Sequence, residues 1–213
     1  MLISLDYLVK QYGIHFKGIL HVGAHECEEL NQYLRYVPIQ KILWVEAIPE
    51  KVAICRHKHP GLLIETAIVS DVIEKVHFHI ANNGQSSSIL SLGTHAHDYP
   101  EIWYTKEIIS ETQLLHDILS NYNNLDFNFV NLDIQGAELK ALQGMRHYLK
   151  KVDYLYTEVN KDYVYKNCAL VGDMDEYLMK FGLYRVETQW ETNQQWGDAF
   201  YIRKDVSPPC TIQ

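Results

Sequence analysis

The 213-residue sequence contains no apolar stretch long enough to span a lipid bilayer. Its first ten residues lack the basic start, apolar core and small-residue cleavage site of a secretory signal. Positive charge is also scarce, because 19 lysines and arginines stand against 27 aspartates and glutamates, for a formal net charge of −8. Since nucleic-acid affinity comes largely from basic side chains, we predict a cytoplasmic protein that binds neither nucleic acid nor membrane.

Cysteine is sparse and dispersed. The four cysteines are Cys27, Cys55, Cys168 and Cys210, and none of them forms a C-x-x-C pair. Such spacing is typical of reduced thiols, and it indicates neither a disulfide framework nor a metal centre.

The chain also has no internal repeat and no low-complexity segment. Its length and its 47% of hydrophobic residues fit one domain with one core. We predict an N-terminal extension over residues 1–17, a single domain over 18–204 and a flexible tail over 205–213, where Pro208 and Pro209 disfavour regular structure.

Strand and helix patterns alternate along this domain. Apolar runs predict strands at 18–22, 41–45, 62–69, 127–132, 153–159, 183–188 and 199–203, and helical periodicity predicts helices at 26–36, 49–57, 114–119, 137–149 and 174–181. Residues 75–80 alternate as a half-exposed strand, whereas 82–107 contain no sustained period and predict a long loop or lid. The pattern predicts an α/β doubly wound sheet that ends in an antiparallel hairpin.

Three of these strands stop abruptly at glycine or an acid. The first ends at Gly23-Ala24, the second at Glu46 and the fourth at Asp133. Ligands of open parallel sheets bind outside the carboxyl ends of the strands, so these endings predict one shared crevice for a nucleoside-containing cofactor. The NAD fingerprint needs three glycines, and Cys27 stands where another would be expected, so pyrophosphate binding is disfavoured.

Two acids, Glu46 and Asp71, have candidate roles in that crevice. Glu46 lies about twenty residues after the glycine turn, where Rossmann-like sheets place an acid that binds both ribose hydroxyls; a solvated acid at a strand end is the alternative. Asp71 could accept a hydrogen bond from an adenine amino group, and a turn aspartate is its alternative.

These residues carry a resemblance to a known family. The motifs are His-Val-Gly-Ala-His at 21–25, Val-Glu-Ala-Ile-Pro at 45–49, Ala-Ile-Val-Ser-Asp at 67–71, the serines at 86–88, Leu-Asp-Ile-Gln-Gly-Ala-Glu-Leu at 132–139 and Gly-Asp-Ala-Phe-Tyr at 197–201. Their order and spacing resemble the FkbM family of S-adenosylmethionine-dependent methyltransferases. The resemblance implies a Rossmann-like class I methyltransferase fold, with a mostly parallel seven-stranded sheet and an antiparallel C-terminal hairpin, and S-adenosylmethionine as cofactor.

The resemblance also implies a set of cofactor-binding residues. They are His21, Gly23, Ala24 and His25 around the methionine moiety, Glu46 and Ala47 at the ribose, Ser70 and Asp71 at the adenine edge, and Asp133, Ile134 and Gln135 beneath the sulfonium. Two positions depart from the family pattern. His21 stands where the family usually has an acid, and Cys27 replaces the second loop glycine, so a lower cofactor affinity or a different loop is expected.

Methyl transfer to a sugar hydroxyl benefits from a base within hydrogen-bond reach. Asp133 is the first candidate for this catalytic role and Glu158, at the end of the next strand, is the second. The two acids could instead share Mg²⁺, which prefers hard oxygen ligands; the sequence offers no further metal ligand.

The sequence therefore predicts an O-methyltransferase that acts on a small polar acceptor, a carbohydrate or glycosylated metabolite, and it leaves the oligomeric state open. The alternative is a catalytically degenerate binding or interaction module, which His21 and Cys27 favour. Acceptor contacts are expected from the 85–107 loop. A sugar-stacking wall could be formed by four aromatic residues, Trp103, Tyr104, Trp190 and Trp196, and packing in the core or the lid is the alternative. A base or metal ligands could be supplied by His95 and His97, and the alternative is that they are simply a polar pair of loop histidines.

Overall fold

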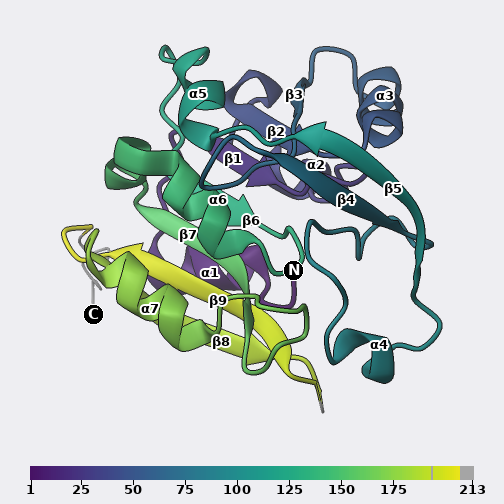
Figure 1. Ribbon diagram of the computed structural model, residues 1–213. Coiled ribbons are helices and arrows are strands. Elements are labelled where there is room, and N and C mark those ends of the chain that lie inside the picture. The colour runs from purple at the N-terminus through teal and green to yellow at the C-terminus, as the bar shows by residue number, and fades with distance from the viewer. Residues whose placement is uncertain (193, 207–213) are drawn as a thin grey trace.

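A seven-stranded sheet forms the centre of the computed structural model, which describes residues 1–192 and 194–206 (Figure 1). The strands are β1 (Ile19–Val22), β2 (Ile42–Glu46), β3 (Leu63–Thr66), β6 (Phe129–Leu132), β7 (Tyr154–Asn160), β8 (Leu183–Trp190) and β9 (Trp196–Arg203). They lie in the order β3-β2-β1-β6-β7-β9-β8. β3, β2, β1, β6 and β7 pair in parallel, while β9 runs antiparallel to both of its neighbours. The predicted Rossmann-like sheet with its antiparallel C-terminal hairpin is therefore confirmed.

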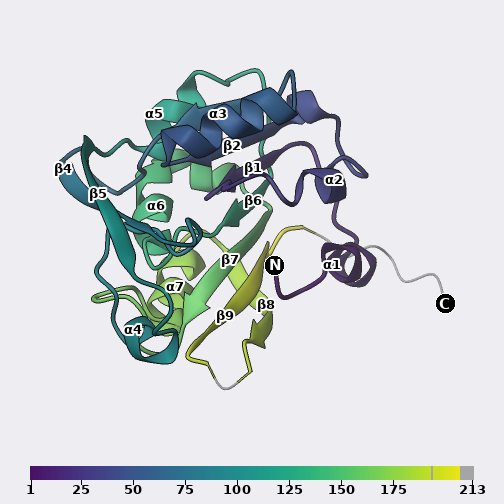
Figure 2. The ribbon, with the colours of Figure 1, turned by 90° about the vertical axis from the view of Figure 1, so that its right-hand side faces the viewer.

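Helices cover both faces of this sheet (Figures 1 and 2). On one face lie α1 (Leu5–Tyr12), α2 (Leu30–Tyr33) and α3 (Pro49–Lys58), and on the other α5 (Leu115–Ser120), α6 (Glu138–Met145) and α7 (Val171–Met179). Successive strand residues alternate between the two cores, as Ile19 and Leu20 do. Both faces of the central strands are buried, which explains why most of their residues are apolar.

The predicted N-terminal extension contains a helix that joins the core. Leu5 and Leu8 of α1 are fully buried and pack in the same cluster as Ile19 and Phe129 of the sheet. Of the predicted tail, 207–213 lie outside the described residues. The domain boundaries at 18 and 204 stay a prediction.

A separate two-stranded ribbon lies beside the sheet (Figures 1 and 2). It pairs β4 (Lys75–Ala81) with β5 (Tyr104–Glu111), and the short helix α4 (His95–Asp98) lies in the connection between them. The alternation predicted for 75–80 is confirmed, because Phe78 packs against Ile48 and Ile68. The prediction of a loop over all of 82–107 is wrong at its end, since β5 begins at Tyr104. Most β5 side chains are exposed, so its pairing with β4 rather than a hydrophobic pattern holds it extended.

Two predicted helices are shorter than their periodicity suggested. The segment 26–36 is helical only in α2, because Cys27 adopts a left-handed φ of 60° and its amide donates back to the Ala24 carbonyl at 2.7 Å. The segment 137–149 is interrupted after Met145, since Arg146 has a φ of 52°, and it continues as a 3₁₀ turn over Arg146–Lys151. A second 3₁₀ turn, Ile39–Lys41, precedes β2.

Cys27, Cys55 and Cys168 are buried free thiols, as predicted, and Cys210 lies outside the described residues. Within the described part of the chain, no helix has both the length and the apolar character that crossing a membrane requires.

Candidate active site

The carboxyl ends of β1, β2 and β6 meet at one edge of the sheet. Val22 is in register with Val45 on one side and Leu132 on the other, so the three loops that follow lie side by side. Gly23, with φ of 92°, fits against the Asp133 carbonyl oxygen, which would lie only 1.8 Å from a Cβ at position 23. No other residue type fits this turn without displacing the Asp133 loop. The sequence pattern thus predicted this meeting point correctly.

A first pocket of about 540 Å³ opens at this edge. Six of the predicted cofactor-binding residues line it: Gly23, His25, Glu46, Ala47, Asp133 and Ile134. Its remaining wall is mostly apolar and includes Ile68, Phe78 and Ile89, while Gln85 and Ser87 approach from the loop after β4. The sequence analysis did not single out Ile68 or Phe78 as pocket residues, and it expected contacts from the 85–107 loop, which carries Gln85, Ser87 and Ile89, to the acceptor.

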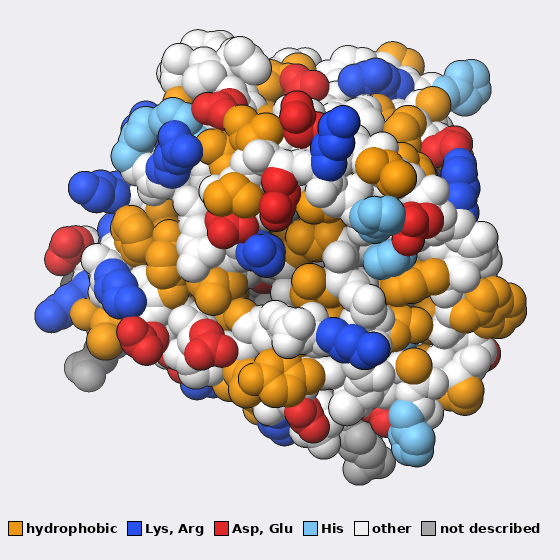
Figure 3. Space-filling view, viewed as in Figure 1, with side chains coloured by type: hydrophobic (Ala, Val, Ile, Leu, Met, Phe, Trp, Pro, Cys, Tyr) orange, Lys and Arg blue, Asp and Glu red, His pale blue; other side chains and the backbone are white. Residues whose placement is uncertain are grey.

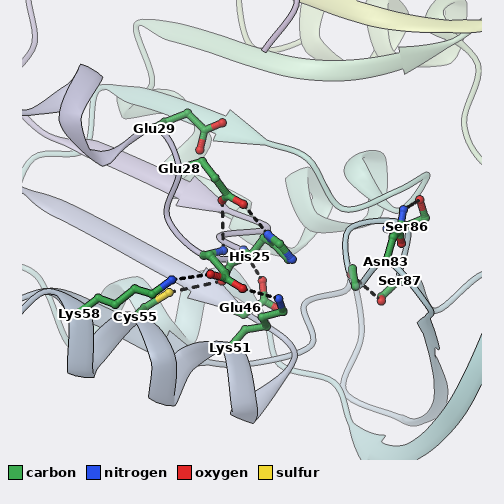
Figure 4. A network of polar contacts seen from close by, with 12 residues as sticks. His25, Glu28, Glu29, Glu46, Lys51, Cys55, Lys58, Asn83, Ser86 and Ser87 are labelled. Atoms are coloured by element: carbon green, nitrogen blue, oxygen red, sulfur yellow. Dashed lines mark hydrogen bonds and ion pairs between the residues drawn. The ribbon is translucent and has the colours of Figure 1, made fainter.

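Glu46 ties two loops together at the floor of the first pocket (Figure 4). One carboxylate oxygen accepts a hydrogen bond from the His25 amide at 2.7 Å, and the other accepts one from the Ile48 amide at 2.8 Å. Burial raises the pKa of Glu46, while these amide donors act in the opposite direction. Glu46 is therefore a buried, backbone-held carboxylate and not a solvated acid at a strand end.

The His25 ring lies at the junction of the glycine turn and the loop after β4. Its Nδ1 lies 2.5 Å from Glu28 Oε1, and its Nε2 is buried without a hydrogen-bond partner among the described residues. Figure 4 shows His25 next to Glu28 and Glu46, with Lys51 and Lys58 reaching toward the same loop from α3. Both lysines form ion pairs with Glu26, at 2.7 and 2.6 Å. These pairs fasten the glycine turn to α3.

Five predicted residues do not line the first pocket: His21, Ala24, Ser70, Asp71 and Gln135. Ala24 is buried behind the turn, and Ser70 is fully buried beside Asp71. Partial burial acts to raise the pKa of Asp71, yet the Ser70 hydrogen bond and the ion pair with Lys140 together hold it below its ordinary value. His21 lies under the sheet edge, where its Nδ1 is 3.0 Å from the Tyr33 hydroxyl and its ring stacks on Trp44.

A second pocket of about 1050 Å³ lies beside the first. The two share Gly23, His25, Gln85 and Asp133. Gln135 lines the second pocket and not the first, as do Glu158 and His21. Its outer wall is aromatic: Trp196 donates to the Tyr99 hydroxyl at 3.0 Å, and the His95 ring lies 4.9 Å from that of Tyr99 and 5.4 Å from that of Tyr165. Of the predicted aromatic wall, Trp196 alone lines this pocket.

The two candidate bases meet in the second pocket through the Gln135 side chain. Its amide nitrogen donates to Asp133 Oδ1 at 2.7 Å and to Glu158 Oε2 at 2.9 Å. Its amide oxygen accepts a hydrogen bond from Tyr165 at 2.6 Å, which fixes the amide's orientation. Tyr165 lies 30 residues from Gln135 in sequence, and no sequence motif marked it.

Both carboxyl groups have raised pKa values. The Asp133 side chain is exposed to the two pockets, and the desolvation caused by the surrounding protein atoms, together with the nearby Asp198, raises its pKa to about 6. Burial and the nearby Asp133 raise the pKa of Glu158 well above its ordinary value. The Gln135 amide lowers both, because it donates to the charged forms.

The loop that carries Asp133 is held from two sides. The Glu138 carboxylate accepts hydrogen bonds from the amides of Ile134 and Gly136, at 2.9 and 3.2 Å. Ser88 donates to the Gln135 carbonyl at 2.7 Å from the loop after β4. These contacts hold Gln135 at a left-handed φ of 57°, a strained value that glycine would adopt freely.

The Mg²⁺ alternative finds little support in this geometry. The Gln135 amide nitrogen lies between the carboxylates of Asp133 and Glu158, where a shared cation would have to bind. Among the described residues, no three or more His, Cys, Asp or Glu side chains are grouped to hold a metal ion.

Comparisons with known proteins agree with this architecture. The 2-O-methyltransferase NoeI of Sinorhizobium fredii is 27% identical over 176 residues, which are 78% of this chain and 72% of that protein. The crystal structure of magnesium protoporphyrin IX methyltransferase from Synechocystis, solved with S-adenosylmethionine bound, matches 93% of this chain and 75% of its own with a TM-score of 0.51 and 9% identity. A putative tRNA (m1A22) methyltransferase of Streptococcus pneumoniae matches 94% of this chain and 70% of its own, with a TM-score of 0.52 and 11% identity.

At 9 and 11% identity, the two solved structures bear on the fold alone. The family evidence comes from the sequence model described as the methyltransferase FkbM domain, which matches residues 21–186. That match spans the glycine turn, Glu46, the Asp133 loop and the ribbon that closes the first pocket. The chain therefore belongs to the FkbM family of methyltransferases.

Proposed function

We propose that this methyltransferase transfers a methyl group from S-adenosylmethionine, held in the first pocket, to a hydroxyl oxygen of a small polar acceptor held in the second. The observation that carries the proposal is that the two pockets meet at Gly23, His25, Gln85 and Asp133. A donor and an acceptor bound on either side of this rim would face each other, which is the arrangement that in-line displacement needs.

Glu46 is the proposed ribose ligand. Its two oxygens each accept one backbone hydrogen bond, and a carboxylate has lone pairs for more, so both can also accept from the ribose hydroxyls. Ile68, Phe78 and Ile89 supply an apolar wall for the adenine ring. The predicted contact of Ser70 and Asp71 with the adenine edge stays a prediction, since neither lines the first pocket.

His25 is the proposed contact to the methionine end of the donor. Glu28 holds its Nδ1, and this leaves Nε2 without a partner at the rim of both pockets. In the imidazolium form both ring nitrogens carry a proton, so Nε2 can donate a hydrogen bond to the methionine carboxylate while Nδ1 donates to Glu28. A departure from the family pattern, His21, lies away from this contact.

Asp133 is the proposed base, with Glu158 as its partner. The bound donor supplies an electrophilic methyl group on a cationic sulfur. Asp133 can take the proton of the acceptor hydroxyl, because it faces both pockets and its raised pKa of about 6 leaves it ionised at neutral pH with useful proton affinity. The Gln135 amide keeps both carboxyl groups oriented.

A carbohydrate acceptor and transfer to oxygen are supported by two observations. The relative NoeI is named a 2-O-methyltransferase. Tyr99, Tyr165 and Trp196 give the second pocket aromatic faces, which pack well against the C–H groups of a sugar ring.

Calorimetric titration with S-adenosylmethionine and S-adenosylhomocysteine, with NAD as control and with and without Mg²⁺, tests the donor assignment. Micromolar binding of the first two alone, independent of Mg²⁺, is the expected result. Transfer of a labelled methyl group to a panel of saccharides then tests the acceptor. Absence of donor binding would instead favour the degenerate binding module.

A further inference from the structure

The charged side chains that line the second pocket are acidic, and the α-amino group of Met1 is a positive charge among them. The lining of this pocket includes the carboxylates of Glu28, Glu29, Asp133 and Glu158, and no lysine or arginine side chain is among the described residues that line it. On the outer face shown in Figure 3, acidic and basic side chains are interspersed. In the described lining of the second pocket, by contrast, acidic side chains occur without lysine or arginine.

Three of these four carboxylates have partners that the proposed reaction explains. Glu28 binds the His25 ring, and Asp133 and Glu158 share the Gln135 amide. These contacts belong to the donor side and to the base. The fourth acidic side chain of the pocket has no role in the proposed reaction.

Glu29 is that acid. Its side chain is 22% exposed, and the nearest ring nitrogen, His21 Nδ1, lies 4.0 Å away. Burial lowers the pKa of His21 to about 3, so this ring is neutral and does not balance the charge. Burial raises the pKa of Glu29, while the amino group of Met1 acts to lower it. Figure 4 shows Glu29 beside Glu28.

A second feature of the same pocket indicates a ligand with hydrogen-bonding groups. His95 is only 6% exposed and lines the pocket, yet its Nδ1 has no hydrogen-bond partner among the described residues. A buried polar atom left without a partner costs free energy, and native structures keep few of them without a reason. Together with the aromatic side chains around it, His95 forms a wall suited to a polar, ring-shaped ligand.

Building on the proposed function, we propose that the acceptor is a saccharide without phosphate or carboxylate groups, and that Glu29 makes the second pocket prefer an amino sugar. An ammonium group on the sugar would supply a direct ion-pair partner for Glu29, which forms no ion pair with a lysine, an arginine or the Met1 amino group among the described residues. A phosphate would enter a site lined by four acidic side chains, with no lysine or arginine among the described lining residues, and the ionised carboxylates among them would repel it. Sugar phosphates and nucleotide sugars are therefore excluded as acceptors.

Three small probes of similar shape, glucosamine, glucose and glucose 6-phosphate, test the proposed preference for an amino sugar over a neutral sugar and a sugar phosphate. Each is titrated into the full chain saturated with S-adenosylhomocysteine, at slightly acidic pH and low salt, and binding is followed by ligand-detected NMR. Glucosamine should bind about tenfold more tightly than glucose, as expected for one partly screened ion pair, and glucose 6-phosphate should bind least. Added salt should reduce the difference in affinity between glucosamine and glucose.

Glu29→Gln should remove most of the preference for glucosamine over glucose. Glu176→Gln is the matched control, because it removes one negative charge from an exposed position on α7 and should preserve the ranking. If Glu29→Gln fails to fold, the salt dependence of the wild-type ranking provides the same test.

Equal or tighter binding of glucose 6-phosphate, an unchanged ranking in Glu29→Gln, or binding of none of the three probes would overturn the inference. Its failure is distinguishable from failure of the proposed function, because binding of S-adenosylhomocysteine is measured first and does not depend on the acceptor.

Discussion

The two pockets that meet at Asp133 are built in different ways. In the first, a mostly apolar wall surrounds Glu46, whose carboxylate is held by backbone amides. In the second, Asp133 and Glu158 are held by the Gln135 side chain, which is in turn held by Tyr165. The first pocket therefore depends on the course of the chain, and the second on a relay of side chains.

This difference has consequences for binding and for chemistry. Backbone amides are fixed by the sheet and remain in place when a side chain is replaced, so a substitution in the first pocket should change affinity at one group. A side-chain relay loses its geometry when any member is removed. Substitutions in the second pocket should therefore affect turnover more than donor binding.

The largest expected effect is that of Asp133→Asn. Loss of the base should lower kcat by about 10²- to 10⁴-fold while the affinity for S-adenosylhomocysteine stays within a few-fold of wild type. Steady-state kinetics with a saccharide acceptor, together with calorimetry, separate the two quantities. Asp117→Asn, an exposed change on α5, serves as control. Normal turnover in the Asp133 variant would remove this residue from the mechanism and would break the contrast between the pockets.

Glu46→Ala should weaken binding of S-adenosylhomocysteine by about 1–3 kcal/mol, the cost of losing hydrogen bonds to a charged group. Glu50→Ala removes an exposed carboxylate four residues further along and should leave affinity unchanged. Calorimetric titration of the three proteins measures the difference. An unaltered affinity in the Glu46 variant would show that the ribose lies elsewhere.

Tyr165→Phe tests whether the hydrogen bond from Tyr165 to Gln135 supports turnover in the second pocket. Without its hydroxyl the Gln135 amide oxygen loses a donor, so kcat should fall about fivefold, the equivalent of one hydrogen bond, with little change in donor affinity. Because the amide then stabilises the ionised carboxylates less, part of the activity should return as pH rises. Tyr104→Phe removes a hydroxyl that binds the Leu90 carbonyl and provides the control. A pH profile identical to wild type would argue against the relay.

The smallest effect concerns stability. Folding raises the pKa of Glu158, so the folded protein holds this proton more tightly, and the resulting stability is present at low pH and is lost as pH rises above the ordinary value of 4.5. Glu158→Gln cannot ionise and should be more stable than wild type at neutral pH, by a few tenths to about 1 kcal/mol, with the gain shrinking toward pH 4. Urea denaturation at several pH values measures it. A gain independent of pH would point to packing instead.

The alternation of apolar runs and helical periods was sufficient to predict the sheet and its C-terminal hairpin. It failed where local geometry or pairing overrides periodicity. The left-handed turn at Cys27 cuts short the helix expected from residue 26, and β5 is extended because it pairs with β4 although its side chains are mostly exposed. Neither effect leaves a hydrophobic pattern along the chain.

The candidate site also has residues that the sequence could locate and contacts that only the structure revealed. The first pocket is formed by strand endings, and Gly23, Glu46 and Asp133 could be located from sequence because parallel strands bring their carboxyl ends to one edge. Gln135 was placed beneath the donor from its motif, and only the structure revealed its contact with two carboxylates and Tyr165.

The sequence by itself determined the order of strands and helices, the sheet edge at which the candidate pockets lie and the family, because these depend on periodicity and on short motifs whose residues are neighbours in the chain. Only the tertiary structure decided which side chains line the second pocket. Glu29, His95, Tyr165 and Trp196 come from four separate segments, and they share one pocket because the sheet, the ribbon and the connecting loops pack together.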